Sequence, residues 1–333
     1  MTTWMLTGGA GYIGANVLRA MRDAGFDVVV LDDLSAGVRR KVPDGVPLVE
    51  ASVLDRDAVA AALREHHVTG VIHLAAKKAV GESVANPLKY YRQNVEGVVA
   101  LLEAMDEVGV RNFVFSSSAA VYGAPKDKIV TEGTKPGPVN PYGSTKLVGE
   151  WVTRQLGAVT GMSWISLRYF NVAGAGAPDL GDTGVHNLVP LVLRAVSKGE
   201  DPIVFGDDYA TPDGTCIRDY IHVTDLAEAH VVAARRVEAG VVDEETGETR
   251  PAATVYNVGT GEGHSVKEVI AAIGTAIGRS LSPQIEERRD GDPPRLVASA
   301  ARIKRDLGWT ASRSLDDIAT SAWEAWQAFP PEA

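Results

Sequence analysis

Cysteine is almost absent from this 333-residue chain, which contains only Cys216. An internal disulfide is therefore impossible, and no cluster of cysteine and histidine suggests structural zinc or another metal site. Long apolar runs are also missing, because none reaches the length that spans a bilayer. The first residues lack the basic segment and apolar stretch of a secretory signal. We therefore expect a cytoplasmic protein that holds no metal and does not contact membranes.

Positive charge is the scarcer sign, with 33 lysines and arginines against 43 acidic residues and a net charge of -10. This balance argues against a surface that binds the phosphate backbone of nucleic acids. If the ligand is an anion, a few local arginines must hold it. The chain is 45% hydrophobic, so it can bury a substantial core in one large domain or two closely joined ones.

Short apolar runs alternate with helical periodicity in the first half of the chain, which is typical of a parallel α/β sheet. We predict helices over 13–24, 55–66, 87–108 and from 142, and buried strands over 3–6, 27–32, 47–50, 70–76, 111–118 and 163–170. The predicted fold class is α/β, with a doubly wound parallel sheet of the Rossmann type and a smaller mixed α/β C-terminal domain.

The stretch TGGAGYIG places Gly8, Gly11 and Gly14 between a predicted strand and a predicted helix. Glycine permits a tight turn there and lets the backbone approach a pyrophosphate, whose charge the helix N-terminus favours. Asp32 ends the next strand, where a carboxylate accepts hydrogen bonds from ribose hydroxyls and repels a 2′-phosphate. These features predict NAD as the cofactor, although the arginines at 39–40 leave NADP open.

The stretch YGSTK sets Tyr142 and Lys146 four residues apart at the start of a helix, so both side chains share one face. A nearby positive charge lowers the pKa of a phenol from about 10, which favours its use as a base. Ser118 ends the strand FSSS, at the edge where open α/β sheets bind ligands. Serine can orient a substrate hydroxyl while tyrosine takes its proton. The three residues predict transfer of hydride from an alcohol to NAD.

Several longer stretches carry a family resemblance, among them LDDL, HLAAKKAVGESV, FSSSAAVYG, NPYGSTK, LRYFNVAGA and DGTCIRDYIHV. They resemble the extended short-chain dehydrogenase/reductase superfamily and, within it, the UDP-glucose 4-epimerases, over nearly the whole chain. The resemblance implies an isomerase of galactose metabolism that interconverts UDP-galactose and UDP-glucose through oxidation and re-reduction at carbon 4. It also implies a homodimer that pairs through the helices around 87–108 and 142–161.

The resemblance further implies which residues form the site. The catalytic residues would be Ser118, Tyr142 and Lys146. The NAD site would comprise Gly8, Gly11, Tyr12, Ile13, Gly14, Asp32, Asp33, Leu34, Ser35, Ala36, Gly37, Ser52, Val53, Leu74, Ala75, Ala76, Lys78, Asn94, Ser118, Tyr142, Lys146 and Phe170. The UDP-sugar site would comprise Ser118, Tyr142, Asn171, Asn187, Leu188, Ile203, Val204, Phe205, Arg218, Arg289, Asp292 and Leu296.

The pattern of elements loosens after Asn171, which suggests where the domains divide. We expect an NAD-binding domain over 1–170, with a later return over roughly 217–260. Residues 171–333 would form mainly the UDP-sugar domain. The polar stretch 238–253 is expected to be an exposed insertion before a further strand at 254–259.

Two positions depart from the family pattern. Ser52, followed by Val53, stands where many relatives have an aspartate that contacts the adenine amino group, although a hydroxyl can still form a hydrogen bond. Ala120 stands where relatives often have a threonine beside the substrate. Ser118 and Tyr142 must then align the substrate hydroxyl alone.

Other functions remain open at this point. A 4-epimerase of UDP-pentoses, UDP-uronates or UDP-N-acetylhexosamines would differ mainly around the sugar substituents. A sugar-nucleotide dehydratase needs an acid pair beside Ser118, where this chain has Ala119 and Ala120. A non-enzymatic NAD-sensing protein would not need both Tyr142 and Lys146.

The resemblance places the side chain of Leu296 beside carbon 2 of the sugar. A large aromatic residue there leaves room only for a hydroxyl, whereas a small residue admits an acetamido group. We expect UDP-hexoses to be preferred over N-acetyl sugars by a steric contact of about 1 to 3 kcal/mol. Leu296→Tyr should strengthen this preference and Leu296→Ala should weaken it. The measurement is kcat/KM for UDP-galactose and UDP-N-acetylgalactosamine. Ratios that do not move in opposite directions would exclude Leu296 as the gate.

Overall fold

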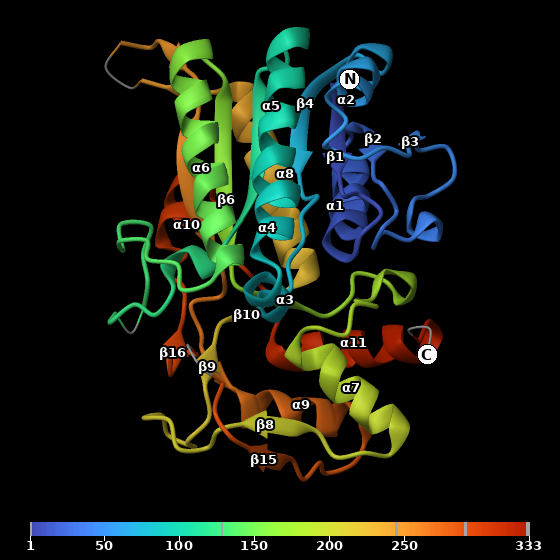
Figure 1. Ribbon diagram of the computed structural model, residues 1–333, viewed down its shortest axis with the longest axis vertical. Coiled ribbons are helices and arrows are strands. Elements are labelled where there is room, and N and C mark those ends of the chain that lie inside the picture. The colour runs from blue at the N-terminus through green and yellow to red at the C-terminus, as the bar shows by residue number, and fades with distance from the viewer. Residues whose placement is uncertain (1, 128, 244–245, 290–291, 331–333) are drawn as a thin grey trace.

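The computed structural model describes residues 2–127, 129–243, 246–289 and 292–330. Its central sheet contains seven strands in the order β13-β6-β5-β4-β1-β2-β3, all paired in parallel (Figure 1). The predicted doubly wound parallel sheet is thereby confirmed. The strands are β1 (Thr3–Thr7), β2 (Asp27–Leu31), β3 (Leu48–Val49), β4 (Val68–His73), β5 (Asn112–Ser118), β6 (Ser163–Tyr169) and β13 (Ala253–Val258).

Helices cover both faces of this sheet because successive strand residues point to opposite sides. Leu6 and Val30 belong to one apolar cluster, and their neighbours Met5 and Val29 belong to the other. The first cluster is covered by α1 (Tyr12–Asp23) and α8 (Val223–Ala239), and the second by α2 (Arg56–Glu65), α5 (Gly97–Val108) and α6 (Pro141–Thr160).

The helix predicted over 87–108 differs from the structure in its middle. It consists of α4 (Pro87–Tyr90), a π-helical segment (Tyr91–Glu96) and α5 (Gly97–Val108), and short helix α3 (Val80–Ala85) precedes it. The buried side chain of Asn94 lies in the π-helical segment and hydrogen-bonds the backbone of Lys77. Single π turns inside helices are frequently found at functional sites.

The lower part of the molecule in Figure 1 has its own apolar cluster, which α7, α9 and α11 form with β8. Strand β8 pairs with β15, β7 pairs with β10, and β9 lies between β14 and β16. These elements are α7 (Leu188–Lys198), α9 (Val266–Ile277), α11 (Leu315–Ala328), β7 (Asn171–Ala173), β8 (Ile203–Phe205), β9 (Ile217–Arg218), β10 (Tyr220–His222), β14 (His264–Ser265), β15 (Gln284–Glu286) and β16 (Arg295–Leu296).

The strands that follow β6 lie outside the central sheet until β13, which pairs with β6. The strands β9 and β10 pair outside the central sheet, whereas Ile303 of α10 (Ala301–Leu307) and Trp309 pack into a cluster that supports it. The polar insertion carries a small exposed hairpin of β11 (Val241–Val242) and β12 (Thr249–Arg250). The domain boundaries stay a prediction. Within the described ranges, no helix is long and apolar enough to cross a membrane.

Candidate active site

The glycine-rich loop joins β1 to the N-terminus of α1. Gly8 has a left-handed backbone, with φ of 73°, and a Cβ there would lie 2.7 Å from the Ala75 nitrogen. A Cβ on Gly14 would lie 2.1 Å from the Gly8 carbonyl oxygen. Gly11 is the N-cap of α1, and no side chain caps the helix there. The first amide groups of α1 are therefore available to an anionic group such as a pyrophosphate.

Asp32 lies beside this loop, where β2 ends. Its carboxylate is buried and accepts hydrogen bonds from the amides of Ala10, at 3.0 Å, and Leu34, at 2.9 Å. Burial raises the pKa of Asp32, and these two hydrogen bonds oppose the rise. Leu34 itself has φ of 54°, a conformation that few non-glycine residues adopt. The turn after β2 is thus wrapped against the glycine-rich loop.

The two arginines near Asp32 have partners away from its carboxylate. Arg39 forms an exposed ion pair with Glu50. The guanidinium of Arg40 lies over the ring of Phe329, 5.4 Å from its centroid. A 2′-phosphate would have to compete with these contacts and with the negative charge of Asp32, so the arrangement favours NAD.

The structure brings Ser118, Tyr142 and Lys146 together where β5 ends and α6 begins. Helix α6 starts at Pro141 because the Asn140 side chain caps it, accepting a hydrogen bond from the Gly143 amide at 2.9 Å. A Cβ on Gly143 would lie 2.5 Å from the Ala120 carbonyl oxygen, so the first turn of α6 lies close to the end of β5.

Lys146 is 4% exposed, which is rare for a lysine. Its ammonium donates to the carbonyl oxygen of Ser116 at 2.8 Å and lies 5.3 Å from the centre of the Phe115 ring. Burial lowers the pKa of Lys146 to about 7. Burial and the charge of Lys146 lower the pKa of the nearby His73 to about 3, so this imidazole stays neutral.

The pKa of Tyr142 differs from the sequence-based expectation. Burial raises this pKa, and a hydrogen bond with Ser118 lowers it in part. We expected Lys146 to lower the pKa of the phenol. The structure shows no such influence of Lys146: loss of solvent raises the pKa of Tyr142, and the lowering contribution comes from the hydrogen bond with Ser118.

Two residues expected at the cofactor make other contacts in this structure. The Asn94 amide group bonds both backbone groups of Lys77 and donates to Thr145 of α6 at 3.1 Å. The ammonium of Lys78 lies 3.8 Å from the Asp182 carboxylate and 5.8 Å from the centre of the Tyr12 ring. Asn94 therefore holds the loop after β4 against α6.

The residues expected at the diphosphate lie outside the central sheet, Arg218 on β9 and Arg289 in the segment after β15. Arg218 of β9 donates to the Pro293 carbonyl oxygen at 2.7 Å and pairs with the Asp292 carboxylate at 3.3 Å. The guanidinium of Arg289 lies 3.8 Å from the centre of the Phe205 ring. Both cations are therefore held beside β8, β9 and β16, as binding of an anionic ligand requires.

The remaining expected substrate residues come from several elements. Asn171 lies on β7, Asn187 caps the start of α7 directly before Leu188, and Ile203 is an exposed residue of β8. Val204 is an exception because its side chain is buried in the apolar cluster of α7, α9 and α11. Leu296 is half-buried against a cluster that includes Phe170, Ala119 and Leu147.

Comparison with known proteins agrees with this geometry. The model of the NAD dependent epimerase/dehydratase family matches residues 4–259. This chain belongs to that family. It is 44% identical to a UDP-glucose 4-epimerase of Azospirillum brasilense, covering 96% of this chain and 91% of the relative. It is 43% identical to the UDP-glucose 4-epimerase of Bacillus subtilis, covering 97% and 96%. The sequence-based resemblance is confirmed.

Solved structures of the epimerase family also match over nearly the full length. A UDP-glucose 4-epimerase from Stenotrophomonas maltophila, with bound NAD and formylated UDP-arabinopyranose, has a TM-score of 0.91, 38% identity and 98% coverage of both chains. One from Bifidobacterium longum, in complex with NAD+ and UDP, has a TM-score of 0.89, 36% identity and 99% coverage of both chains.

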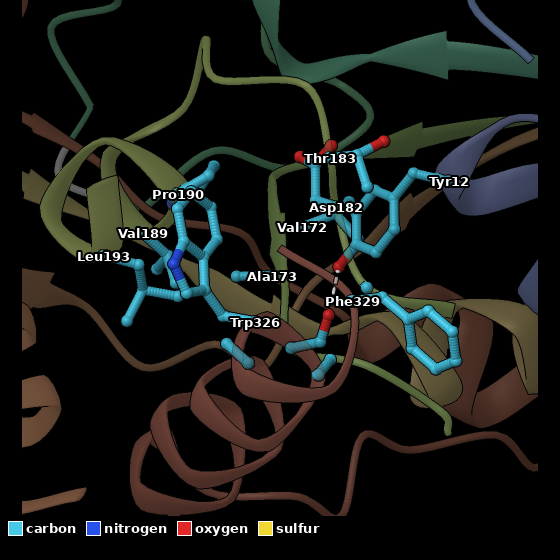
Figure 2. Close-up of a pocket in the computed structure, with 14 residues that line it drawn as sticks. Tyr12, Val172, Ala173, Asp182, Thr183, Val189, Pro190, Leu193, Trp326 and Phe329 are labelled. Atoms are coloured by element: carbon cyan, nitrogen blue, oxygen red, sulfur yellow. Dashed lines mark hydrogen bonds between the residues drawn. The ribbon is translucent and has the colours of Figure 1, made fainter. Parts of the chain in front are cut away.

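This member of the epimerase family has a pocket beside the glycine-rich loop. Figure 2 shows the Tyr12 phenol pointing into it and donating to the Gly174 carbonyl oxygen, at 2.6 Å. Pro190 of α7 and Trp326 of α11 line the opposite side. The lining does not include Ser118, Tyr142 or Lys146, so the residues predicted to be catalytic lie outside this pocket.

Sequence reasoning missed several residues that shape the site. The Ser116 carbonyl that binds Lys146 has no sequence signature, because any residue supplies a carbonyl. Glu150 was overlooked although it follows Lys146 by four residues and faces the sheet from α6. Its helical spacing from Tyr142 and Lys146 was the available signal. Among the described residues, no group of three or more candidate ligands could hold a metal ion.

The lowered pKa of Lys146, about 7, generates a test of stability against pH. An unfolded lysine has a pKa of about 10.4, so between about pH 7 and 10 the unfolded chain binds more protons and the folded wild type gains stability as pH rises. Lys146→Met should remove a slope of at most about 1.4 kcal/mol per pH unit. Denaturant unfolding at several pH values measures the slope. The exposed lysine variant Lys135→Met should retain it. Equal slopes in wild type and Lys146→Met would contradict the lowered pKa of Lys146.

Proposed function

We propose that this protein interconverts UDP-galactose and UDP-glucose by inverting carbon 4 of the sugar. One observation carries the proposal: Ser118, Tyr142 and Lys146 meet at the carboxyl edge of a sheet whose glycine-rich loop suits a dinucleotide. The high identity to named UDP-glucose 4-epimerases over nearly the full chain supports the choice of substrate.

The residues around the glycine-rich loop fit NAD. Gly8 and Gly14 leave no room for a Cβ, and the start of α1 has no side-chain cap. Asp32 would hold the adenine ribose. The chemistry that NAD would supply when held there is reversible hydride acceptance from carbon 4 of the sugar. The two transfers cancel, so the net reaction is an isomerisation.

Each catalytic residue has a separate task in the proposed reaction. Tyr142 takes the proton of the 4-hydroxyl as this carbon is oxidised, and returns a proton when the ketone is reduced. Ser118 orients the hydroxyl through its hydrogen bond to the same phenol. Lys146, held by the Ser116 carbonyl, supplies a positive charge that favours the phenolate. The raised pKa of the phenol disfavours its ionised form, so a nearby positive charge would assist the proton transfer.

The diphosphate would provide most of the binding free energy. Arg218 and Arg289 carry guanidinium groups, which match the geometry of phosphate oxygens. The sugar is then held loosely enough to rotate and present either face of the 4-ketone. Retention of the UDP portion keeps the ketone in the site during this rotation.

The decisive test is incubation with UDP-galactose and no added NAD. We expect UDP-glucose to form, and Tyr142→Phe to reduce kcat at least about 100-fold because it removes only the proton acceptor. UDP binding should be unchanged. Tyr256→Phe is the matched control because it makes the same substitution at a phenol that hydrogen-bonds Asp306 and not Ser118. A ketosugar released as the main product, or no turnover by wild type, would refute the proposed function. Residual activity above about a tenth would refute the role of Tyr142.

We also infer that two copies of this chain pair through α4 and α6. These helices pack against each other (Figure 1). Leu88 is nevertheless 82% exposed and Trp151 is 50% exposed. Val84 and Tyr91 add exposed apolar surface on the neighbouring segments. A second copy related by a two-fold axis would cover the same surface on both chains.

A cytoplasmic location stays a prediction.

Light scattering at micromolar concentration tests the dimer. Wild type should have twice the mass of one 35.3 kDa chain. The double variant Leu88→Glu/Trp151→Glu should have the mass of one chain, because it buries two charges in the proposed interface. Val242→Glu, on the exposed strand β11, should remain dimeric. A monomeric wild type would exclude this interface.

A further inference from the structure

A buried ion pair lies behind the catalytic residues on α6. Glu150 follows Lys146 by one helical turn and Tyr142 by two, and it is 5% exposed. The Arg168 guanidinium, on β6, donates to both carboxylate oxygens of Glu150, at 2.7 Å from Nε and 2.5 Å from Nη2. The hydroxyl of Ser117 donates to the same carboxylate. Glu150 therefore joins α6 to two neighbouring strands, β5 and β6.

The pair continues into a buried chain of hydrogen bonds. The third guanidinium nitrogen of Arg168, Nη1, donates to the Tyr122 phenol at 3.0 Å, and this phenol donates to the Asn257 amide oxygen at 2.6 Å. Asn257 of β13 then donates to the Val130 carbonyl oxygen at 3.1 Å. The Val130 amide donates to the carbonyl of Val297, the residue after Leu296, at 2.9 Å. The network thus reaches from the catalytic helix to the strand that carries the proposed substrate gate.

Stability alone does not explain this pair. Burying two charges removes them from water, and well-packed apolar residues of similar size are often equally stabilising. Burial acts to lower the pKa of Arg168, but the hydrogen bonds and charge of Glu150 outweigh it and raise that pKa. An apolar pair would not reproduce the geometric specificity of the ion pair. Both hydrogen bonds of a bidentate contact form only when the helix has one particular position and rotation.

Helix α6 packs closely on β5 beside the ion pair. A Cβ on Gly149 would lie 2.4 Å from the tip of the Phe115 ring, so the helix lies directly on the strand there. One turn earlier, the Lys146 ammonium reaches the Ser116 carbonyl across the same surface. The helix can therefore slide or rotate only if the Glu150 contacts break.

We propose that the Glu150–Arg168 ion pair is a positioning element. It fixes the position of α6 along its axis and the rotation of α6 about that axis, so that Tyr142 and Lys146 lie at the end of β5. This inference rests on the proposed function, because positioning matters through the proton transfer at Tyr142. Glu150 and Arg168 act through the helix and do not contact the substrate. A displacement of the phenol by about 1 Å costs roughly 100-fold in rate when reacting groups must be aligned.

The test compares a charge-breaking variant with a charge-free pair. Glu150→Gln should lower kcat about 10- to 100-fold while KM for UDP-galactose changes less than about twofold. It should also lower Tm, because Arg168 is left buried without its countercharge. The double variant Glu150→Met/Arg168→Met should recover Tm through apolar packing but retain the low kcat. Asp225→Asn is the control: it removes the charge of a buried carboxylate on α8 that pairs with the half-buried Arg313, so it should lower Tm and leave kcat unchanged.

Recovery of kcat together with Tm in the double variant would overturn the proposal, because the pair would then be only structural. A second measurement is independent of turnover. Hydrogen exchange of the α6 amides over 144–150 should be at least about tenfold faster in both variants of Glu150 and unchanged in Asp225→Asn. Unchanged exchange in Glu150→Gln would also overturn the proposal. If wild type does not epimerise UDP-galactose, the proposed function fails, but the exchange data still decide whether the pair positions α6.

Discussion

The contact on which the site depends is the hydrogen bond from the buried Lys146 ammonium to the Ser116 carbonyl, at 2.8 Å. A cation that is 4% exposed needs a fixed partner, and a backbone carbonyl near the end of strand β5 supplies it. This requirement brings α6 close to the carboxyl edge of the sheet. The same approach sets the Tyr142 phenol beside Ser118. Electrostatics and packing thus select one arrangement of helix and strand.

Burial shifts the pKa values of the proposed catalytic groups. The pKa of Tyr142 is raised and that of Lys146 is lowered to about 7, both through loss of solvent. In water the phenol and the ammonium both have a pKa of about 10, so these opposite shifts move the two proton affinities apart and leave Tyr142 as the group that holds its proton more tightly. His73, kept neutral by burial, adds no competing charge.

The two ligand regions are built differently. The proposed NAD region uses one compact unit, in which the glycine-rich loop and Asp32 contact each other through the Ala10 amide. The proposed UDP-sugar region gathers side chains from β7, α7, β8, β9 and β16, which are separated by long stretches of chain. Asp219 helps to assemble this second region. Its carboxylate accepts hydrogen bonds from the Thr260, Gly261 and Ala298 amides, which tie β9 to the end of β16.

Much of the fold could be predicted because its signals are local. Glycines at 8, 11 and 14, the alternation of apolar strands and helices, and the four-residue spacing of Tyr142 and Lys146 all depend on near neighbours. The resemblance carried the prediction to the substrate residues. The helix over 87–108 was predicted without its π-helical segment, since that segment depends on a contact between Asn94 and the distant loop at Lys77.

The sequence by itself determined the sheet, the glycine-rich loop and the spacing of the proposed catalytic residues, because each follows from residue type and short spacing. Only the tertiary structure decided the charge states of Tyr142 and Lys146, because desolvation depends on everything packed around a group. It also decided that Glu150 pairs with Arg168 and that Val204 is buried, since strands and helices far apart in the chain meet there. Contacts over long sequence separation leave no local pattern from which they could be read.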